Sequence, residues 1–276
     1  MGLEAGRASI KMAGFQTETL AMTSTHALER WALAFKSVDW LIPAYLQMQF
    51  LSQCVANIEQ ATTENKPKIL QGILRKTYDE RHLASMLLGL YSKTIYIRDY
   101  ERQISQTIEA SCFGLHHAAV ATMIPVLEGI IRKNAVAGGR DVGSGTRKII
   151  EELDNILANE MASPNRFEER VIMFQVLRDF FNERLLIRTT DYSGSHEFNR
   201  HGILHGVFEN YGSETNFFRC ITILELLCFT MGMLYGGSCF APEETAQSAK
   251  LANYYRCLKF WSARAAPFRA IHKQLR

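Results

Sequence analysis

Residues that interrupt helices are scarce in this chain. Only six of the 276 residues are proline, and 18 are glycine. Because these two residues are the strongest local breakers of regular structure, their scarcity predicts long helices. The alternation of apolar and polar side chains that is typical of half-buried strands is also missing. We therefore expect an all-α fold.

The cysteines lack the close spacing of a zinc-binding pair, since no two of them lie within three residues of each other. They lie in apolar stretches, which indicates buried thiols that pack as small hydrophobic side chains. Reduced thiols are typical of a reducing cytosol. The cysteines are Cys54, Cys112, Cys220, Cys228, Cys239 and Cys257.

Signals for export and for membrane insertion are also missing. The N-terminus has no apolar h-region, so we expect no signal peptide. The longest apolar run, residues 221–235, is interrupted by Glu225 and falls short of the roughly 20 residues that a membrane span needs. We therefore predict a cytoplasmic protein without a membrane partner.

No strong charge of either sign is present. Lys and Arg number 31 against 28 Asp and Glu, which gives a formal net charge of +3. So small an excess does not by itself imply binding to nucleic acid, although a local patch could still be basic. The residues from Arg256 to Arg276 form such a basic tail.

The helical spacing of apolar residues divides the chain into three expected regions. Residues 1–92 form an N-terminal helical region, of which residues 1–15 are expected to be unstructured. Residues 93–240 form a helical bundle. Residues 241–276 form a final helix, expected at about 243–264, and the basic tail.

Several boundaries follow from capping and breaking residues. Pro43 and Pro67 are each expected in the first turn of a helix. Residues 96–134 carry the longest helical pattern, which Pro125 is expected to kink or to split in two. Residues 137–145 (AGGRDVGSG) predict a connector or a lid; they lack the Lys-Ser/Thr ending of a phosphate-binding loop. Ser213 is expected to cap the apolar helix that follows it.

Residues 197–206 (EFNRHGILHG) concentrate polar and reactive side chains. Arg200 and His205 are five residues apart, which on a helix places them about 140° past a full turn, so they do not stack. They could still meet across a two-fold interface, or if the helix distorts at Gly202. His201 and His205 are four residues apart and are expected to share a face.

These residue types suit RNA cleavage without a metal. A neutral histidine can accept the proton of a 2′-hydroxyl at pH 7. An arginine fork matches the negative charge that gathers on the phosphate oxygens. Two other interpretations stay open: the histidines could be structural, or Glu197, His201 and His205 could form a metal-binding face.

Residues 199–206 (NRHGILHG), then residues 211–216 (YGSETN) and an apolar helix, resemble the HEPN superfamily (higher eukaryotes and prokaryotes nucleotide-binding domains). Arg200, His201 and His205 match the hallmark of this family: Arg, a polar residue, about three others, then His. The resemblance also takes in an earlier helix like residues 125–132. Many HEPN members are ribonucleases in toxin–antitoxin, phage-defence and RNA-processing systems.

The resemblance implies a HEPN-like bundle within residues 93–240, to which the N-terminal helical region and the C-terminal helix are additions. It also implies a homodimer in which the Arg and His of both subunits meet at the interface, RNA as substrate, and neither a metal nor a cofactor. A toxin or phage-defence effector would also have an antitoxin or defence-system partner.

Site roles follow from the same resemblance and from the chemistry above. Arg200 would hold the phosphate and His205 would transfer the proton. Asn199 and His201 would orient or bind the RNA, supported by Glu128 and Arg132 on a neighbouring helix. The alternative is a catalytically inactive module that dimerises or binds a nucleotide or a partner, in which these residues stabilise a loop.

Overall fold

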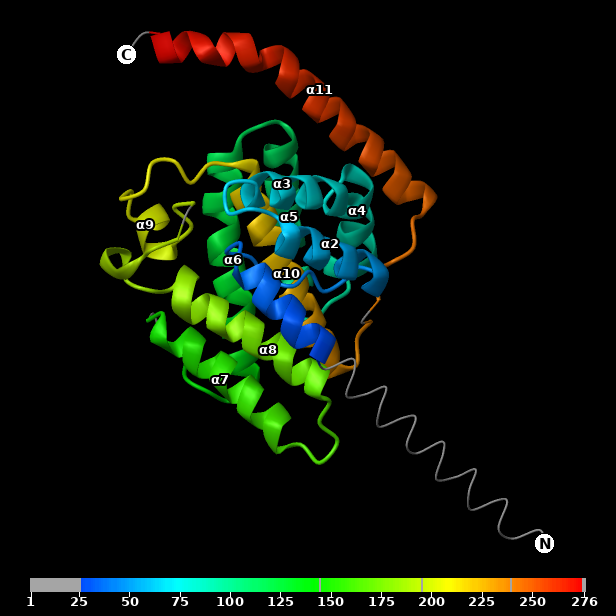
Figure 1. Cartoon of the computed structure of the whole chain (residues 1–276), viewed down its shortest axis with the longest axis vertical. Coiled ribbons are helices and arrows are strands. Elements are labelled where there is room, and N and C mark those ends of the chain that lie inside the picture. Colours follow the sequence, from blue (N-terminus) through cyan, green and yellow to red (C-terminus); the bar gives the residue numbers. More distant parts are fainter. Residues whose placement is uncertain (1–25, 144, 195, 239, 275–276) are drawn as a thin grey trace, which may run out of the picture.

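Helix α10 (Glu214–Tyr235) runs through the middle of the molecule, and other helices surround it (Figure 1). The computed structural model describes residues 26–143, 145–194, 196–238 and 240–274. No strand occurs in these ranges, so the predicted all-α class is confirmed. Besides a helical segment at residues 26–36, the remaining α-helices are α2 (Met48–Gln60), α3 (Lys66–Thr77), α4 (Glu80–Met86), α5 (Glu101–Cys112), α6 (His116–Ala137), α7 (Arg147–Ala162), α8 (Glu168–Phe180), α9 (Arg200–Leu204) and α11 (Ala246–Gln274).

Short π-helical and 3-10 turns extend or join several of these helices. The π-helical turns are η1 (Leu87–Tyr91) and η3 (Phe181–Leu185). The 3-10 turns are η2 (Arg98–Tyr100) and η4 (Thr189–Asp191). Helix α8 continues directly into η3, whose end leads to the segment that carries the sequence motif.

Helix α10 carries apolar side chains on every side, interrupted by few polar residues, and this composition suits a central position. It packs against α6, α8 and α3. As predicted, Ser213 caps its start by accepting a hydrogen bond from the backbone N–H of Asn216. At 22 residues the helix is longer than the apolar run suggested, and by length and composition it could cross a membrane. However, 83% of its most apolar stretch is buried inside the protein, as expected of the core helix of a globular fold.

The long helical pattern divides at Gly114; of the kink or split predicted at Pro125, the split does not occur. Helix α6 continues through Pro125 to Ala137. The turn between α5 and α6 places Gly114 at φ +79°, a conformation that residues with a Cβ atom rarely adopt. A Cβ there would also lie 2.6 Å from the Ser262 hydroxyl oxygen. The conformation of Gly114 and the close packing around it therefore both favour glycine at the point where this pattern divides.

Two other boundaries differ from expectation. Pro67 lies in the first turn of α3 as predicted, but Pro43 lies in a loop that precedes α2 by several residues. The buried side chains of Leu41 and Ile42 hold that loop against the core. The final helix begins at Ala246 rather than about 243, because Thr245 accepts a hydrogen bond from the N–H of Ser248 and acts as its cap. It also continues through Pro267 to Gln274.

The three expected regions share one buried core. The cluster of buried apolar side chains extends from Leu28 to Tyr255 and includes residues of all three. Helix α11 lies along one edge of the bundle, where it packs against α4 and α5 (Figure 1). The expectation for residues 1–15 lies outside the described residues.

The cysteines behave largely as predicted. Five of the six are described, and all five are free thiols; Cys239 lies outside the described residues. Four are buried and Cys257 is exposed. Burial raises the pKa of the Cys54 thiol to about 11 and that of Cys112 to about 12. Such thiols remain protonated and unreactive at neutral pH.

Candidate active site at helix α9

The motif forms a single helical turn, α9, that is fixed at both ends. The side chain of Asn199 caps its start by accepting a hydrogen bond from the N–H of Gly202 at 3.0 Å. The helix ends at Leu204, and Gly206 follows at φ +69°. The chain then folds back, and the N–H groups of Val207 and Phe208 both donate to the carbonyl of Gly202. A Cβ at Gly202 would lie 2.4 Å from the ring of Phe208, so only glycine fits there without rearrangement.

Three polar side chains surround the guanidinium of Arg200. Its Nε donates to the carboxylate of Glu128 on α6 at 3.0 Å. Its Nη1 lies 3.4 Å from Nδ1 of His201 and 3.5 Å from Nε2 of His205. Because a guanidinium can only donate, a hydrogen bond from Arg200 to either imidazole requires that the ring nitrogen facing it carries a lone pair. The site thus combines a cation that can bind phosphate with nitrogens that can accept a proton.

Arg200 and His205 meet within one chain, which the helical spacing alone did not predict. The reason is that α9 ends before His205, whose backbone is no longer helical (φ −102°, ψ 7°). The rings of His201 and His205 stack with their centroids 5.9 Å apart, so their predicted common face is confirmed. His205 and Leu204 are exposed to solvent.

The surroundings of His201 favour its neutral form. Partial burial lowers the pKa of His201, and the positive charge of Arg200 lowers it further. A histidine that is neutral at pH 7 can accept a proton or a hydrogen bond. Both histidines lie beside Arg200, the cation at which a phosphate would bind.

Glu128 and Arg132 both lie on the neighbouring helix α6, as predicted, and are four residues apart on one face, but they make different contacts. Glu128 is buried and lies between Arg200 and Arg132, whose Nη2 is 3.9 Å from its carboxylate. Arg132 also donates to the carbonyls of Val142 and Gly143. It thereby fastens the glycine-rich loop after α6 to the same face of the molecule. The loop is therefore a connector that Arg132 binds to α6. Glu128 is the residue that positions Arg200.

Asn199 is placed to position the motif and does not reach the surface. Its side chain is fully buried. Besides capping α9, its amide donates to the carbonyl of Arg184 at 3.0 Å and to that of Ile187 at 2.8 Å. All of its hydrogen-bonding groups are therefore used inside the protein, and RNA contact by Asn199 would require this segment to open.

The metal-binding alternative finds no support in the geometry. The carboxylate of Glu197 accepts a hydrogen bond from the N–H of Asn210 at 2.7 Å, and among the described residues it makes no hydrogen bond with His201 or His205. Within the described ranges, no group of three His, Cys, Asp or Glu side chains could hold a metal ion.

One residue near the motif was missed in the sequence. Arg219 of α10 is completely buried. Its Nη1 donates to Oδ1 of Asn216 at 2.7 Å and its Nη2 to the carbonyl of Asp39 at 3.0 Å. Its guanidinium lies between the rings of Trp40 and Phe198, 4.8 and 5.2 Å from their centres. The signal in the sequence was a single arginine inside an otherwise apolar helix.

Comparison with known proteins adds no relative. No family model, curated protein or solved structure matches the chain. The resemblance to HEPN proteins therefore remains a prediction that rests on the motif and its neighbours.

Proposed function

We propose that this protein is a metal-independent endoribonuclease of the HEPN type that acts as a homodimer. The observation that supports this most is the position of Arg200, whose guanidinium lies within 3.5 Å of His205 at the surface. This pair supplies the two functions that cleavage of an RNA phosphodiester needs without a metal: a phosphate-binding cation and a proton acceptor.

The proposed reaction uses the 2′-hydroxyl of RNA as nucleophile. Arg200 binds the non-bridging oxygens of the phosphate. His205 removes the proton from the 2′-hydroxyl, and the resulting oxygen attacks the phosphorus. The bond to the 5′-oxygen breaks, and that oxygen takes up a proton from water or from the imidazolium of a second copy of the motif. The products are a 2′,3′-cyclic phosphate and a 5′-hydroxyl, and DNA is not cleaved because it has no 2′-hydroxyl.

The surface beside the motif supports a dimer. Val207 is 60% exposed and Leu204 is 37% exposed, and both flank the Arg200–His205 pair. Apolar side chains around a polar site are suited to a self-complementary interface between two copies of a chain. Such an interface would place two sets of Arg200 and His205 together. The role as a toxin or phage-defence effector, with an antitoxin or defence-system partner, follows from the resemblance alone.

One observation favours the alternative, a catalytically inactive module for dimerisation or for binding a nucleotide or a partner. Arg200 already has an ion-pair partner in Glu128, and Asn199 is used entirely inside the fold. The motif then serves to hold α9 against α6, and the exposed Leu204 and Val207 serve to dock another molecule.

The test is RNA cleavage in excess EDTA by the wild-type chain, Arg200→Ala and His205→Ala, each first shown to be folded and dimeric. We expect His205→Ala to lower the rate by about 10²- to 10⁴-fold, the usual contribution of a general acid–base group. His26→Ala is a matched control, because His26 is exposed and bonds only within its own helix.

The nuclease proposal is supported if the wild-type chain and the His26→Ala control cleave RNA in EDTA while Arg200→Ala and His205→Ala do not. If none of the proteins cleaves RNA while Leu204→Asp or Val207→Asp breaks the dimer, the inactive module is the better description. Equal cleavage by all of them would place the activity elsewhere and exclude the roles proposed for Arg200 and His205.

A further inference from the structure

Helix α11, at the edge of the molecule, carries a row of mostly apolar side chains on its outer side (Figure 1). Its inner side packs against α4 and α5. The members of this outer row are all exposed and recur alternately three and four residues apart: Tyr254, Cys257, Trp261, Arg264, Phe268 and Ile271. This spacing is that of the a and d positions of a coiled coil, the narrow seam that packs against a second helix.

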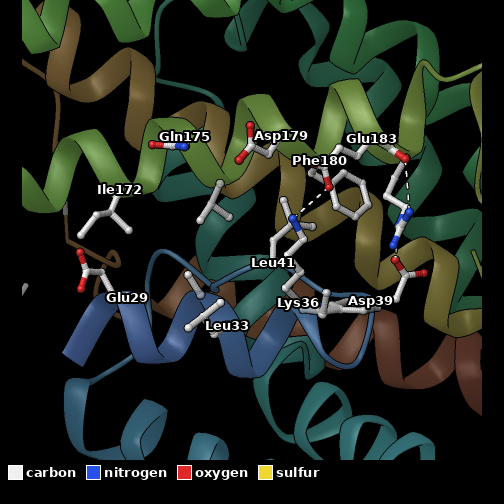
Figure 2. A pocket seen from close by; sticks show the side chains of 14 residues that line it. Glu29, Leu33, Lys36, Asp39, Leu41, Ile172, Gln175, Asp179, Phe180 and Glu183 are labelled. Carbon is white, nitrogen blue, oxygen red and sulfur yellow. Dashed lines mark hydrogen bonds and ion pairs between the residues drawn. The ribbon is translucent and has the colours of Figure 1, made fainter. Parts of the chain in front are cut away.

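Burial distinguishes the two sides of α11. Tyr255 on the inner side is completely buried, whereas Trp261 and Phe268 on the outer side are 58% and 71% exposed. Exposed apolar side chains elsewhere have apolar neighbours within the chain: Figure 2 shows Leu33 facing helix α8 across a groove. The outer row of α11 points away from the bundle, and so large an apolar surface on a soluble fold is typical of an interaction site.

The positive charges of α11 lie mainly off this seam. Between residues 254 and 271 the cations outside the row are Arg256, Lys259 and Arg269. The first two lie 3.8 and 2.6 Å from the carboxylate of Glu80 on α4, and Arg269 donates to the carbonyl of Phe113 at 3.1 Å. These cations therefore serve to hold α11 on the bundle. The e and g positions that flank the seam are uncharged: Leu258, Phe260, Ala265 and Pro267.

Uncharged flanks indicate which kind of helix fits the row. In coiled coils the e and g positions select an oppositely charged partner when they are charged. Here they make no such selection, and an identical apolar surface complements the row as well as any other. A helix of a second copy of the chain therefore meets the requirement, and two-fold symmetry makes each contact occur twice.

Arg264, the single cation within the row, determines the orientation of such a pair. In a parallel pair it would face Arg264 of the second copy, and the two charges would repel. In an antiparallel pair, with the two-fold axis midway between Trp261 and Arg264, each Arg264 faces Trp261 of the second copy. A guanidinium over a tryptophan ring is a favourable contact, which this fold already uses where Arg219 lies 4.8 Å from the ring centre of Trp40.

The same register matches the rest of the row. Cys257 faces Phe268 of the second copy, and Tyr254 faces Ile271, so no other charge enters the seam. On its own helix, the guanidinium of Arg264 already lies 4.6 Å from the ring centre of Phe260. In the pair it would thus lie among aromatic rings of both copies.

The exposed rings offer enough area for a specific interface. Tyr254, Phe260, Trp261 and Phe268 are 45% to 71% exposed, which at about 200 Å² for each side chain leaves on the order of 450 Å² per copy. Two copies, with the rest of the row, reach the roughly 1,000 Å² that a specific interface needs. Because α4 and α5 already hold the helix, pairing does not have to order it.

We propose that the outer row of α11 is a self-association site, at which α11 pairs in antiparallel orientation with α11 of a second copy of the chain. Arg264 sets this orientation through its contact with Trp261 of the second copy. The row shares no residue with the surface at Leu204 and Val207 beside the motif, and the pairing does not depend on the proposed nuclease activity.

Sedimentation of the full chain with Leu204→Asp tests the pairing, because this change disrupts the surface proposed beside the motif. We expect this chain to remain a reversible dimer. Adding Trp261→Ala or Phe268→Ala is expected to raise the dissociation constant at least about 30-fold, the effect of one interface hot spot. Met161→Ala on α7, where Met161 is 53% exposed, is the matched control and is expected to change nothing.

Two results would overturn the pairing: a monomeric Leu204→Asp chain, or a dimer that neither substitution on α11 weakens more than Met161→Ala does. All of these positions are exposed, so folded variants are expected, and circular dichroism checks them.

Cross-linking tests the orientation. Cys257 is exposed, and the other described cysteines are buried. In the Phe268→Cys variant, a short bismaleimide is expected to join Cys257 of one copy to the new thiol at position 268 of the other. Adding Cys257→Ser is expected to abolish this link. Peptide mapping that instead finds Cys257 joined to Cys257 would show parallel pairing and overturn the proposed orientation.

Tryptophan fluorescence distinguishes a second copy from other occupants of the row. Trp31 and Trp40 are buried, so a change of emission on association reports Trp261. We expect the emission of the Leu204→Asp chain to shift to the blue as its own concentration rises. A shift that needs phosphatidylserine vesicles would assign the row to a membrane surface, and quenching that needs single-stranded RNA would assign it to RNA. Either result, without dependence on protein concentration, would overturn the second copy. Because no cleavage is measured, this failure is distinct from a failure of the proposed function.

Discussion

Two arginines close to the motif show how differently the fold treats the same side chain. Arg200 lies at the surface of α9, where its side chain is 21% exposed and its partners are a carboxylate and two imidazoles. Arg219 lies inside α10, has no exposure, and is enclosed by two aromatic rings, an amide and the Asp39 backbone. The first can exchange its partners for a ligand, whereas the second cannot move without opening the core.

The two arginines differ in role: Arg219 helps to position the motif, and Arg200 is available to bind a ligand. Arg219 joins the loop before α2, through Asp39 and Trp40, to Phe198 at the start of the motif. It therefore helps to determine where α9 lies. Arg200 then presents its guanidinium from that fixed turn. A cation that is buried among groups of the core contributes to structure, and a cation with displaceable partners is available for binding.

The largest expected effect is on stability and comes from Arg219. Arg219→Ala leaves the side chain of Asn216 and the carbonyl of Asp39 without their donor and opens a cavity between two rings. It also removes the cation that lies 3.6 Å from the Asp39 carboxylate. We expect the free energy of unfolding to fall by about 3–5 kcal/mol, as when one partner of a buried ion pair is removed. Arg200→Ala, measured in parallel by urea denaturation, is expected to cost about 1 kcal/mol. Equal losses in the two variants would contradict the distinction between a structural arginine and a binding one.

Two substitutions of Asn199 test whether this residue positions the motif only by capping helix α9. Asn199→Ala is expected to cost about 2 kcal/mol, since caps contribute about 0.5–2 kcal/mol. Asn199→Asp keeps a good cap, but its carboxylate would face the carbonyls of Arg184 and Ile187, to which the amide now donates. We therefore expect Asp to be more destabilising than Ala. The reverse order in thermal unfolding would show that capping is the main role of this side chain.

The sequence predicted the helices better than it predicted the site. The apolar spacing, the cap at Ser213 and the first-turn position of Pro67 depend on local physics, and the structure confirms them. The division at Gly114 was missed although glycine is a local breaker of helices. Only the structure shows that Gly114 adopts φ +79° and that the close approach of Ser262, about 150 residues away in the chain, leaves no room for a Cβ atom. Local patterns cannot report such an approach.

The same limit applies to the candidate site. The sequence identified Arg200, His201, His205 and Glu128 as residues of one site, and the structure brings them together. It could not show that α9 ends at Leu204, which is what allows Arg200 to reach His205. Nor could it show that Asn199 points inward, because that depends on the carbonyl groups at the end of η3.

A second buried ion pair gives a smaller, pH-dependent effect. Nε2 of His82 on α4 lies 2.6 Å from the carboxylate of Glu225 on α10. Burial opposes the charged form of His82, but the charge and the hydrogen bond of Glu225 outweigh it and raise the pKa of His82. A raised pKa means that the folded state binds the proton more tightly than the unfolded state. The pair therefore stabilises the fold most below the usual histidine pKa, and this contribution is lost as the pH rises through the folded value.

His82→Gln tests this contribution. We expect it to lower the free energy of unfolding by on the order of 1 kcal/mol near pH 5.5, the usual net value for a hydrogen bond. The difference from wild type should shrink steadily toward pH 9. Urea denaturation across this pH range measures it. A difference that stays constant with pH would mean that the pair contributes through packing alone.

The smallest expected effect concerns the competition between Glu128 and phosphate for Arg200. Glu128→Gln removes the negative charge 3.0 Å from the guanidinium but keeps a side chain of the same shape. Affinity for an RNA analogue with 2′-deoxy nucleotides, which cannot be cleaved by the proposed route, is expected to rise about two- to fivefold. Glu151→Gln changes the net charge equally on α7, where Glu151 pairs with Arg147 and Lys148. A rise seen with Glu128→Gln alone means that the phosphate binds at Arg200. An equal rise in both variants means that the analogue responds to overall charge, and the surface arginine would then be as structural as the buried one.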